Sequence, residues 1–187
     1  MKFSTRTGLC RGIRDTDWGR VGAAAVFGSA SLCGLFAITG VAGIRINTTS
    51  SLPIGLYVET NSQSRLVEFC PSGLSAAISA RRGYRGSGHC PDGASPLLKP
   101  IVAQTGDVVE MSAEGISVNN RAIRNTAPLS VDTDRRPLEH FPFGRYVVGA
   151  DEVWVASSYN QRSFDSRYYG PVPTIEIRAH LRPLLTF

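Results

Sequence analysis

The hydropathy pattern is dominated by one long run without charged residues, which covers residues 21–44 and is bracketed by Arg20 and Arg45. Twenty-four residues at about 1.5 Å each give a helix of about 36 Å, longer than the roughly 30 Å hydrocarbon core of a bilayer. The run therefore predicts a membrane-spanning helix. The alternative is a cleaved secretory signal, whose apolar core usually spans about 7–15 residues, so we expect a retained anchor.

Beyond residue 45 the apolar positions fall in short runs separated by glycine, proline and asparagine. Such runs are typical of β-strands, and Glu114-Gly115 and Asn119-Asn120 indicate turns between neighbouring strands. One short helix is expected over residues 72–82 and a surface loop over 125–142. Strands are expected at residues 56–59, 66–69, 97–103, 107–111, 116–118, 121–123, 144–148, 152–156 and 176–184. The pattern predicts a mainly antiparallel β domain, coiled or barrel-like.

The charges around the apolar run predict the orientation of the chain. Five basic residues and two acidic ones precede the run. After the run, Arg45 is followed by no basic residue until Arg65. The positive-inside rule then makes residues 1–20 a cytoplasmic tail, 21–44 the anchor and 45–187 an exported domain. The net charge of +5 is spread thinly along the chain, and without a basic cluster beside aromatic residues we expect no nucleic-acid partner.

Two of the four cysteines, Cys70 and Cys90, fall in the exported part, where an oxidising compartment permits a disulfide. The alternative is a zinc site that uses His89 beside Cys90. Neither Cys-x-x-Cys nor His-x-x-x-His spacing accompanies these residues, so we expect no metal and no other cofactor.

Lysine usage is the most informative part of the composition, because only Lys2 and Lys99 are lysines among twenty basic residues. Arginine keeps its proton in proteins, whereas a buried lysine can lose it. Leu97 and Ile101 share the expected strand face of Lys99, so burial would lower its pKa. The neutral amine could then serve as general base for a serine nucleophile. The alternative is a lysine that reaches solvent from a strand edge.

Two further segments carry side chains suited to such chemistry. The hydroxyl-rich residues 47–51 lead into Leu52-Pro53-Ile54-Gly55, a turn before a strand, although a juxtamembrane linker has the same composition. Near the C-terminus, Asp165 and Arg167 are spaced to pair on one side of a strand or extended loop, and the Ser163 hydroxyl could hydrogen-bond the Lys99 amine. A Ser-His-Asp triad is the rival arrangement. Its histidine would have to come from His89, His140 or His180, none of which lies in a strong motif.

Taken together and in this order, the three segments resemble the type I signal peptidases. The shared motifs are Ser-x-Pro at residues 51–53, the Lys99 strand ending in Gly106-Asp107, and Asp-Ser-Arg-Tyr-Tyr-Gly at residues 165–170. Residues 45–57 are most similar to the conjugative-transfer branch, the TraF-type peptidases. The resemblance covers most of residues 44–184 and implies the coiled β fold of signal peptidases with one N-terminal transmembrane helix.

The resemblance also implies roles for individual residues. Ser51 would be the nucleophile and Lys99 its general base, while the Thr49 hydroxyl and the Ser51 amide would bind the oxyanion. The resemblance further implies that Ser163 orients the lysine and that the pair Asp165 and Arg167 supports the site. Because Ser50 adjoins Ser51, the choice of nucleophile depends on the spacing to Pro53.

Two departures from the housekeeping enzymes favour the specialised branch. Leu52 stands where those enzymes usually have methionine, and residues 157–162 replace their Gly-Asp-Asn-Arg-Asp-Asn stretch. We therefore predict a Ser/Lys endopeptidase anchored in the bacterial inner membrane, with its catalytic domain in the periplasm. The resemblance implies an exported precursor as substrate, a conjugative pilin subunit, with cyclisation where an amine resolves the acyl-enzyme. It also implies the conjugation machinery as a partner.

Two other functions remain open. A general signal peptidase that removes leader peptides would use the same dyad. A non-catalytic anchored β module of a conjugation or secretion assembly would account for the anchor and the strands, but not for Ser51 and Lys99 in a peptidase context.

Overall fold

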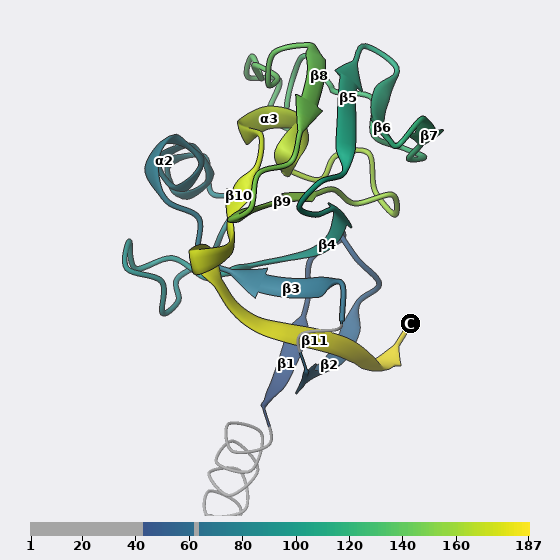
Figure 1. Cartoon of the computed structure of the whole chain (residues 1–187). Helices are drawn as coiled ribbons and strands as arrows, with labels where there is room; N and C mark the ends of the chain where they lie inside the picture. The colour runs from purple at the N-terminus through teal and green to yellow at the C-terminus, as the bar shows by residue number, and fades with distance from the viewer. Residues whose placement is uncertain (1–42, 62–63) are drawn as a thin grey trace, which may run out of the picture. The chain divides into compact units, whose positions relative to one another are not determined.

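The computed structural model describes residues 43–61 and 64–187 (Figure 1). The predicted cytoplasmic tail and nearly all of the predicted anchor lie outside these ranges. Ile44, assigned to the anchor from the sequence, instead begins the first described strand. Within the described ranges, no helix combines the length and apolar character needed to cross a membrane.

The larger of two sheets has seven strands in the order β1-β2-β11-β3-β4-β9-β10. Every pairing in it is antiparallel. Its strands are β1 (Ile44–Asn47), β2 (Gly55–Thr60), β3 (Leu66–Phe69), β4 (Leu97–Ala103), β9 (Glu152–Val155), β10 (Val172–Pro173) and β11 (Ile177–Thr186). The long C-terminal strand β11 lies between β2 and β3 and pairs with both (Figure 1).

The smaller sheet has four strands in the order β7-β6-β5-β8. They are β5 (Val108–Ser112), β6 (Gly115–Val118), β7 (Arg121–Ala122) and β8 (Gly144–Val147). The helical elements are α2 (Gly73–Arg81), the single turn α3 (Ser166–Tyr169) and the 3-10 turn η1 (Thr174–Glu176). The prediction of a mainly antiparallel β domain is confirmed.

The strands expected from the sequence are confirmed with small shifts at their ends. Residues 66–69 and 97–103 match in full, and the predicted helix over 72–82 forms as α2. Four elements were missed. β1 merges with the apolar run in the sequence, β10 has two residues, and α3 and η1 are each about one turn.

Two apolar clusters form the core that carries the site. Trp154 and Ala103 of the larger sheet pack with Val109, Met111 and Ile116 of the smaller one. The other cluster lies on one face of β3, β4 and β9. β4 alternates between buried and half-buried positions along its whole length. Its buried face carries Leu97, Lys99 and Ile101 in succession, as the sequence predicted.

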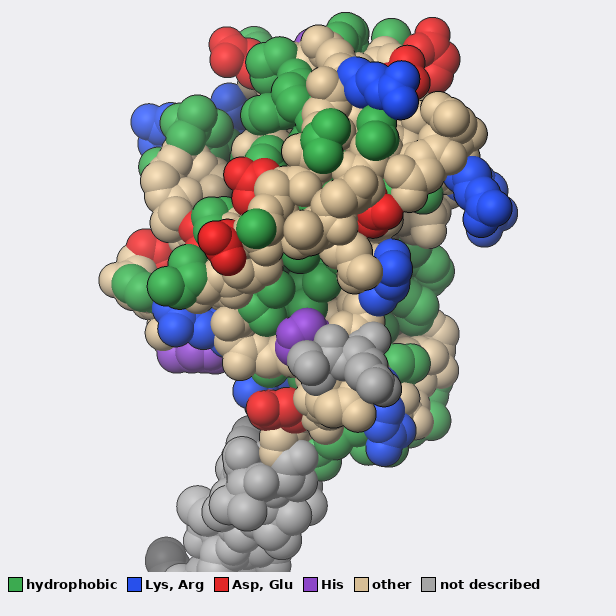
Figure 2. Space-filling model, in the orientation of Figure 1, with side chains coloured by type: hydrophobic (Ala, Val, Ile, Leu, Met, Phe, Trp, Pro, Cys, Tyr) green, Lys and Arg blue, Asp and Glu red, His purple; other side chains and the backbone are tan. Residues whose placement is uncertain are grey.

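A disulfide joins Cys70 to Cys90, with their Cα atoms 5.5 Å apart. The Cys90 sulfur is therefore part of a disulfide, whereas the zinc alternative required it as a thiol. Cys70 directly follows β3, and Cys90 lies in the loop before β4, so the disulfide ties the loop over residues 82–96 to the sheet. On the face drawn in Figure 2, basic side chains are dispersed among acidic and uncharged ones.

Replacing both cysteines by alanine should destabilise the protein by about 3 kcal/mol, because the crosslink closes a loop of 20 residues. Urea unfolding of the full chain in detergent micelles, followed by tryptophan fluorescence, measures this difference. A reductant should lower the wild-type midpoint and leave that of the double variant unchanged. Equal midpoints for the two proteins without reductant would contradict the structural role of the disulfide.

Candidate active site

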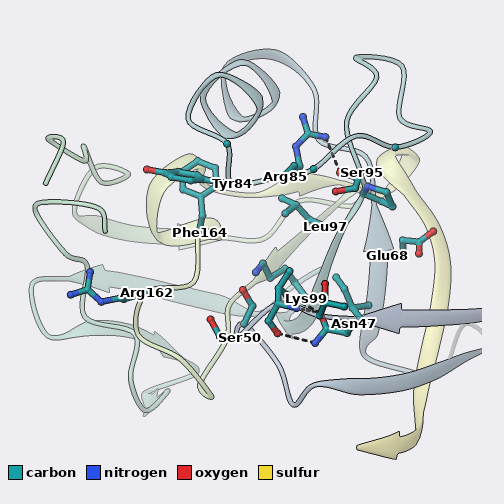
Figure 3. Close-up of a pocket in the computed structure, with 18 of the residues that line it drawn as sticks. Asn47, Ser50, Glu68, Tyr84, Arg85, Ser95, Leu97, Lys99, Arg162 and Phe164 are labelled. Carbon is teal, nitrogen blue, oxygen red and sulfur yellow. Dashed lines mark hydrogen bonds between the residues drawn. The ribbon is translucent and has the colours of Figure 1, made fainter. Parts of the chain in front are cut away.

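A cleft of about 730 Å³ brings the predicted Ser51 segment and Lys99 to one place. One wall consists of β1 and the residues that follow it, 45–51, and another consists of residues 83–89 in the loop that the disulfide closes. The first half of β4 lies between them. In Figure 3, Ser50 and Asn47 flank Lys99, whereas Tyr84 and Phe164 lie toward the other end of the cleft.

Lys99 is 3% exposed, so its amine does not reach bulk solvent from the strand edge. Burial lowers its pKa to about 8, with the negative charge of Asp165 opposing this shift and the positive charge of Arg167 adding to it. The pairing of β4 with β9 begins at Ile101. Lys99 pairs with Val67 of β3 on one edge of β4, and it lies before the part of β4 that pairs with β9. Its side chain lines the cleft.

The Asn47 side chain organises the Ser51 segment. Its Nδ2 donates to the carbonyl oxygens of Thr49 (3.0 Å), Leu52 (3.3 Å) and Pro53 (3.0 Å). Its Oδ1 accepts from the Thr49 amide at 3.2 Å and from Thr49 Oγ1 at 2.8 Å. A single buried amide thus closes the turn around Ser51, and the residues that sequence reasoning treated as a possible linker form a fixed loop.

Thr49 lines the cleft next to Ser51, as its implied oxyanion role requires. In this structure its hydroxyl donates to Asn47 Oδ1. A hydroxyl has one hydrogen to donate, so Thr49 has to turn that hydrogen away from Asn47 to stabilise an oxyanion.

Ser50 and Ser51 differ in how their hydroxyls are engaged. Asn160 Nδ2 donates to both the carbonyl oxygen (3.1 Å) and Oγ (3.0 Å) of Ser50. The Ser51 carbonyl accepts from Ser157 Oγ, while the Ser51 hydroxyl forms no hydrogen bond to any other residue that the structure describes.

Ser163 is 2% exposed, and its Oγ has no hydrogen-bond partner within residues 43–61 and 64–187. A buried hydroxyl without a partner costs about 1–3 kcal/mol. In the same part of the chain, no hydrogen bond joins Lys99 Nζ to Ser51 or to Ser163. Catalytic hydrogen bonds often form only when substrate is bound.

Asp165 and Arg167 form a fully buried ion pair, as their spacing predicted. The pair was expected on a strand or an extended loop. Asp165 instead caps the N-terminus of α3 from an extended residue, and Arg167 lies in the first turn of that helix. Arg167 also donates to the carbonyl oxygens of Gln161 (2.7 Å) and Ser163 (2.8 Å). The pair therefore fixes the loop over residues 156–163, which hydrogen-bonds the Ser50 and Ser51 backbone.

Within residues 43–61 and 64–187, none of the three histidines hydrogen-bonds a serine hydroxyl, as a triad would require. His89 lies in the cleft wall, 3.8 Å from Glu68. His140 stacks on Phe143, and His180 contacts the backbone of Ser64.

Sequence reasoning missed three residues that hold the site together, and they are Asn47, Ser157 and Asn160. Asn47 lies in the hydroxyl-rich stretch 47–51, whose composition also suits a linker. The other two lie in the stretch 157–162, whose departure from the housekeeping sequence was the available signal.

Replacing Lys99 by methionine should stabilise the protein at pH 7, because it removes the need to bury a charge. The wild-type amine loses its proton from about pH 8 upward in the folded state, whereas the unfolded chain keeps its own to about 10.4. The unfolded state then binds more protons, so the free energy of unfolding of the wild type rises with pH. The gap in free energy of unfolding between Lys99→Met and wild type should therefore narrow by about 2 kcal/mol between pH 7 and 9.5.

Urea unfolding at both pH values measures this gap, with Arg145→Met on the exposed strand β8 as the matched control. The control should show no such narrowing. A gap between Lys99→Met and wild type that stays constant with pH would contradict the lowered pKa.

Comparison with known proteins places this site in a family. The chain matches the family "Signal peptidase, peptidase S26" over residues 18–184. Plasmid transfer protein TraF of Escherichia coli is 35% identical over 150 residues, 78% of this chain and 84% of that protein. Conjugal transfer protein TraF of Agrobacterium tumefaciens is 35% identical over 170 residues, 88% of this chain and 92% of that protein.

A solved structure is also similar, that of a signal peptidase I from Enterococcus faecalis. It is 16% identical, with a TM-score of 0.36, and the match covers 66% of this chain and 99% of that one. The family match spans most of the described domain, and the relatives are covered over most of their length. The chain belongs to the signal peptidase family, peptidase S26.

Proposed function

We propose that this protein is a serine endopeptidase that uses Ser51 as nucleophile and Lys99 as general base. The observation that carries the proposal is the buried Lys99 amine, with a pKa of about 8, in the same cleft as the Ser51 segment. A substantial fraction of such an amine is neutral near pH 7–8, and a neutral amine can accept a hydroxyl proton.

In the proposed reaction, Ser51 Oγ attacks the scissile carbonyl carbon while Lys99 Nζ accepts the Oγ proton. The resulting oxyanion receives hydrogen bonds from the Ser51 amide and from the Thr49 hydroxyl once it turns from Asn47, at about 3–4 kcal/mol per donor. Lys99 then gives its proton to the leaving amine, and an acyl-enzyme remains. Water resolves it by hydrolysis, whereas an amine of the same substrate would close a ring.

The substrate is proposed to bind as an extended segment along β4. Residues 97–99 precede the part of β4 that pairs with β9, whose register begins at Ile101. An added strand can use the backbone groups at such an edge, with side-chain pockets supplying selectivity. This arrangement would place a scissile bond beside Lys99.

For the substrate, we propose an exported precursor of a conjugation system, a pilin subunit, with the conjugation machinery as partner. The names of the relatives, which are plasmid and conjugal transfer proteins, support this choice over a general signal peptidase. The anchor predicted over residues 21–44 would hold the catalytic domain at the periplasmic surface of the inner membrane, where such a precursor emerges.

Mass spectrometry of a pilin precursor co-expressed with this protein tests the proposal. The wild type should shorten the precursor, with a further loss of one water where the product is cyclic. Ser51→Ala and Lys99→Arg should each abolish processing, because the first lacks the nucleophile and the guanidinium of the second keeps its proton.

Ser50→Ala is the matched control and should retain processing. Cleavage by Ser51→Ala or by Lys99→Arg would contradict the dyad. An unprocessed pilin precursor beside a cleaved leader-peptide substrate would favour the general signal peptidase. If neither is cleaved and a serine-reactive probe leaves Ser51 unmodified, the non-catalytic module is supported.

Activity should also rise with pH through the pKa of Lys99. Below about pH 8 the amine is mostly protonated, so kcat/KM should increase about tenfold per pH unit and level off above it. Initial rates between pH 6 and 9.5 on a precursor-derived peptide measure this profile. A profile centred near pH 6.5 would instead indicate a histidine base and contradict the assignment to Lys99.

A further inference from the structure

We infer that Ser157 is a positioning residue that sets the nucleophile against its base, with Asn160 holding the neighbouring carbonyl. This inference rests on the proposed function, since it assigns a role within the Ser51–Lys99 dyad. Neither residue belongs to the motifs that the resemblance supplied.

The two halves of the dyad come from distant parts of the larger sheet. Ser51 lies in the connection between β1 and β2, whereas Lys99 is in β4, and β2, β11 and β3 lie between β1 and β4. No direct strand pairing therefore fixes the distance between the Ser51 hydroxyl and the Lys99 amine. Another connection has to align them.

The loop after β9 supplies that connection. The Ala156 amide donates to the carbonyl oxygen of Pro100, the residue next to Lys99, at 3.1 Å. Ser157 follows at once, and its Oγ donates to the carbonyl oxygen of Ser51. Two hydrogen bonds from adjacent residues thus link β4, which carries Lys99, to the backbone of Ser51.

Ser157 is itself held in a fixed orientation. It is fully buried, and its amide donates to Asp165 Oδ2 at 3.0 Å. Its Oγ accepts from the amides of Tyr159 (3.1 Å) and Asn160 (3.3 Å). Because those two amides occupy its acceptor sites, the single hydroxyl hydrogen is directed to Ser51. The buried ion pair of Asp165 thereby acts on the nucleophile through Ser157.

Asn160 secures the other side of the nucleophile. Its Nδ2 donates to the Ser50 carbonyl and hydroxyl, while its Oδ1 accepts from the Arg162 amide at 2.9 Å. Figure 3 shows Ser50 and Arg162 on the same side of Lys99. The carbonyls of two consecutive residues, Ser50 and Ser51, are therefore both bound by side chains of one loop.

Loss of this alignment should reduce turnover more than substrate binding. Proton transfer needs Ser51 Oγ within about 3 Å of Lys99 Nζ, and a misplacement of about 1 Å can cost 100-fold in rate. The β4 edge and the cleft walls proposed to bind substrate do not include Ser157 or Asn160. KM should accordingly change little.

The test compares Ser157→Ala and Asn160→Ala with the wild type, using the full chain in detergent micelles and a precursor-derived peptide. We expect kcat to fall about 10–100-fold for Ser157→Ala and about 5–10-fold for Asn160→Ala, with KM within twofold. The reaction rate of Ser51 with a fluorophosphonate probe should fall in parallel. Ser158→Ala is the matched control, since Ser158 is exposed in the same loop, and it should keep wild-type kcat.

Wild-type kcat in both variants, or a raised KM with unchanged kcat, would overturn the inference. If Ser157→Ala proves unfolded by its thermal transition, Asn160→Ala, whose side chain is partly exposed, decides the outcome. A wild-type protein that neither cleaves nor reacts with the probe would refute the proposed function instead. A reactive wild type with unaffected variants would refute the positioning role alone.

Discussion

The burial of one amine is the constraint on which the rest of this structure depends. Lys99 lies in a strand whose inward face otherwise carries Leu97, Ile101 and Ala103, and it is 3% exposed. An ammonium group at such a position is costly, and the protein relieves that cost by lowering the pKa to about 8 rather than by placing a carboxylate in contact. The negative charge of Asp165 favours the charged form of the amine, but Asp165 is paired with Arg167.

Two kinds of interaction position the two sides of the site: strand pairing on one side, and hydrogen bonds of polar side chains on the other. The antiparallel ladder carries Lys99 to the cleft, and the disulfide holds the opposite wall. The segment around Ser51, between β1 and β2, has no such strand pairing. Asn47 closes it from one side, and Ser157 with Asn160 hold its backbone from the other. The conformation of Ser51 therefore depends on hydrogen bonds between segments more than 100 residues apart.

The features that could be predicted from the sequence are those that depend on neighbouring residues. The strand spacing and the inward face of β4 follow from alternating apolar residues, so the burial of Lys99 could be predicted. The partners of Ser157 and Asn160 could not, because hydrogen bonds between distant loops leave no periodic signal in the chain. The pairing of Asp165 with Arg167 was predicted from their spacing on a strand or extended loop, but a capped helical turn brings them together. The anchor over residues 21–44 stays a prediction.

The most direct test of this account is the titration of the Lys99 amine itself. Since Lys2 and Lys99 are the only lysines in the chain, protein labelled with ¹³Cε-lysine gives two side-chain signals, and Lys99→Met assigns them by the loss of one. The account predicts that the Lys99 signal titrates with a pKa of about 8. Two signals that both titrate near 10.4, the value of an exposed lysine, would contradict it.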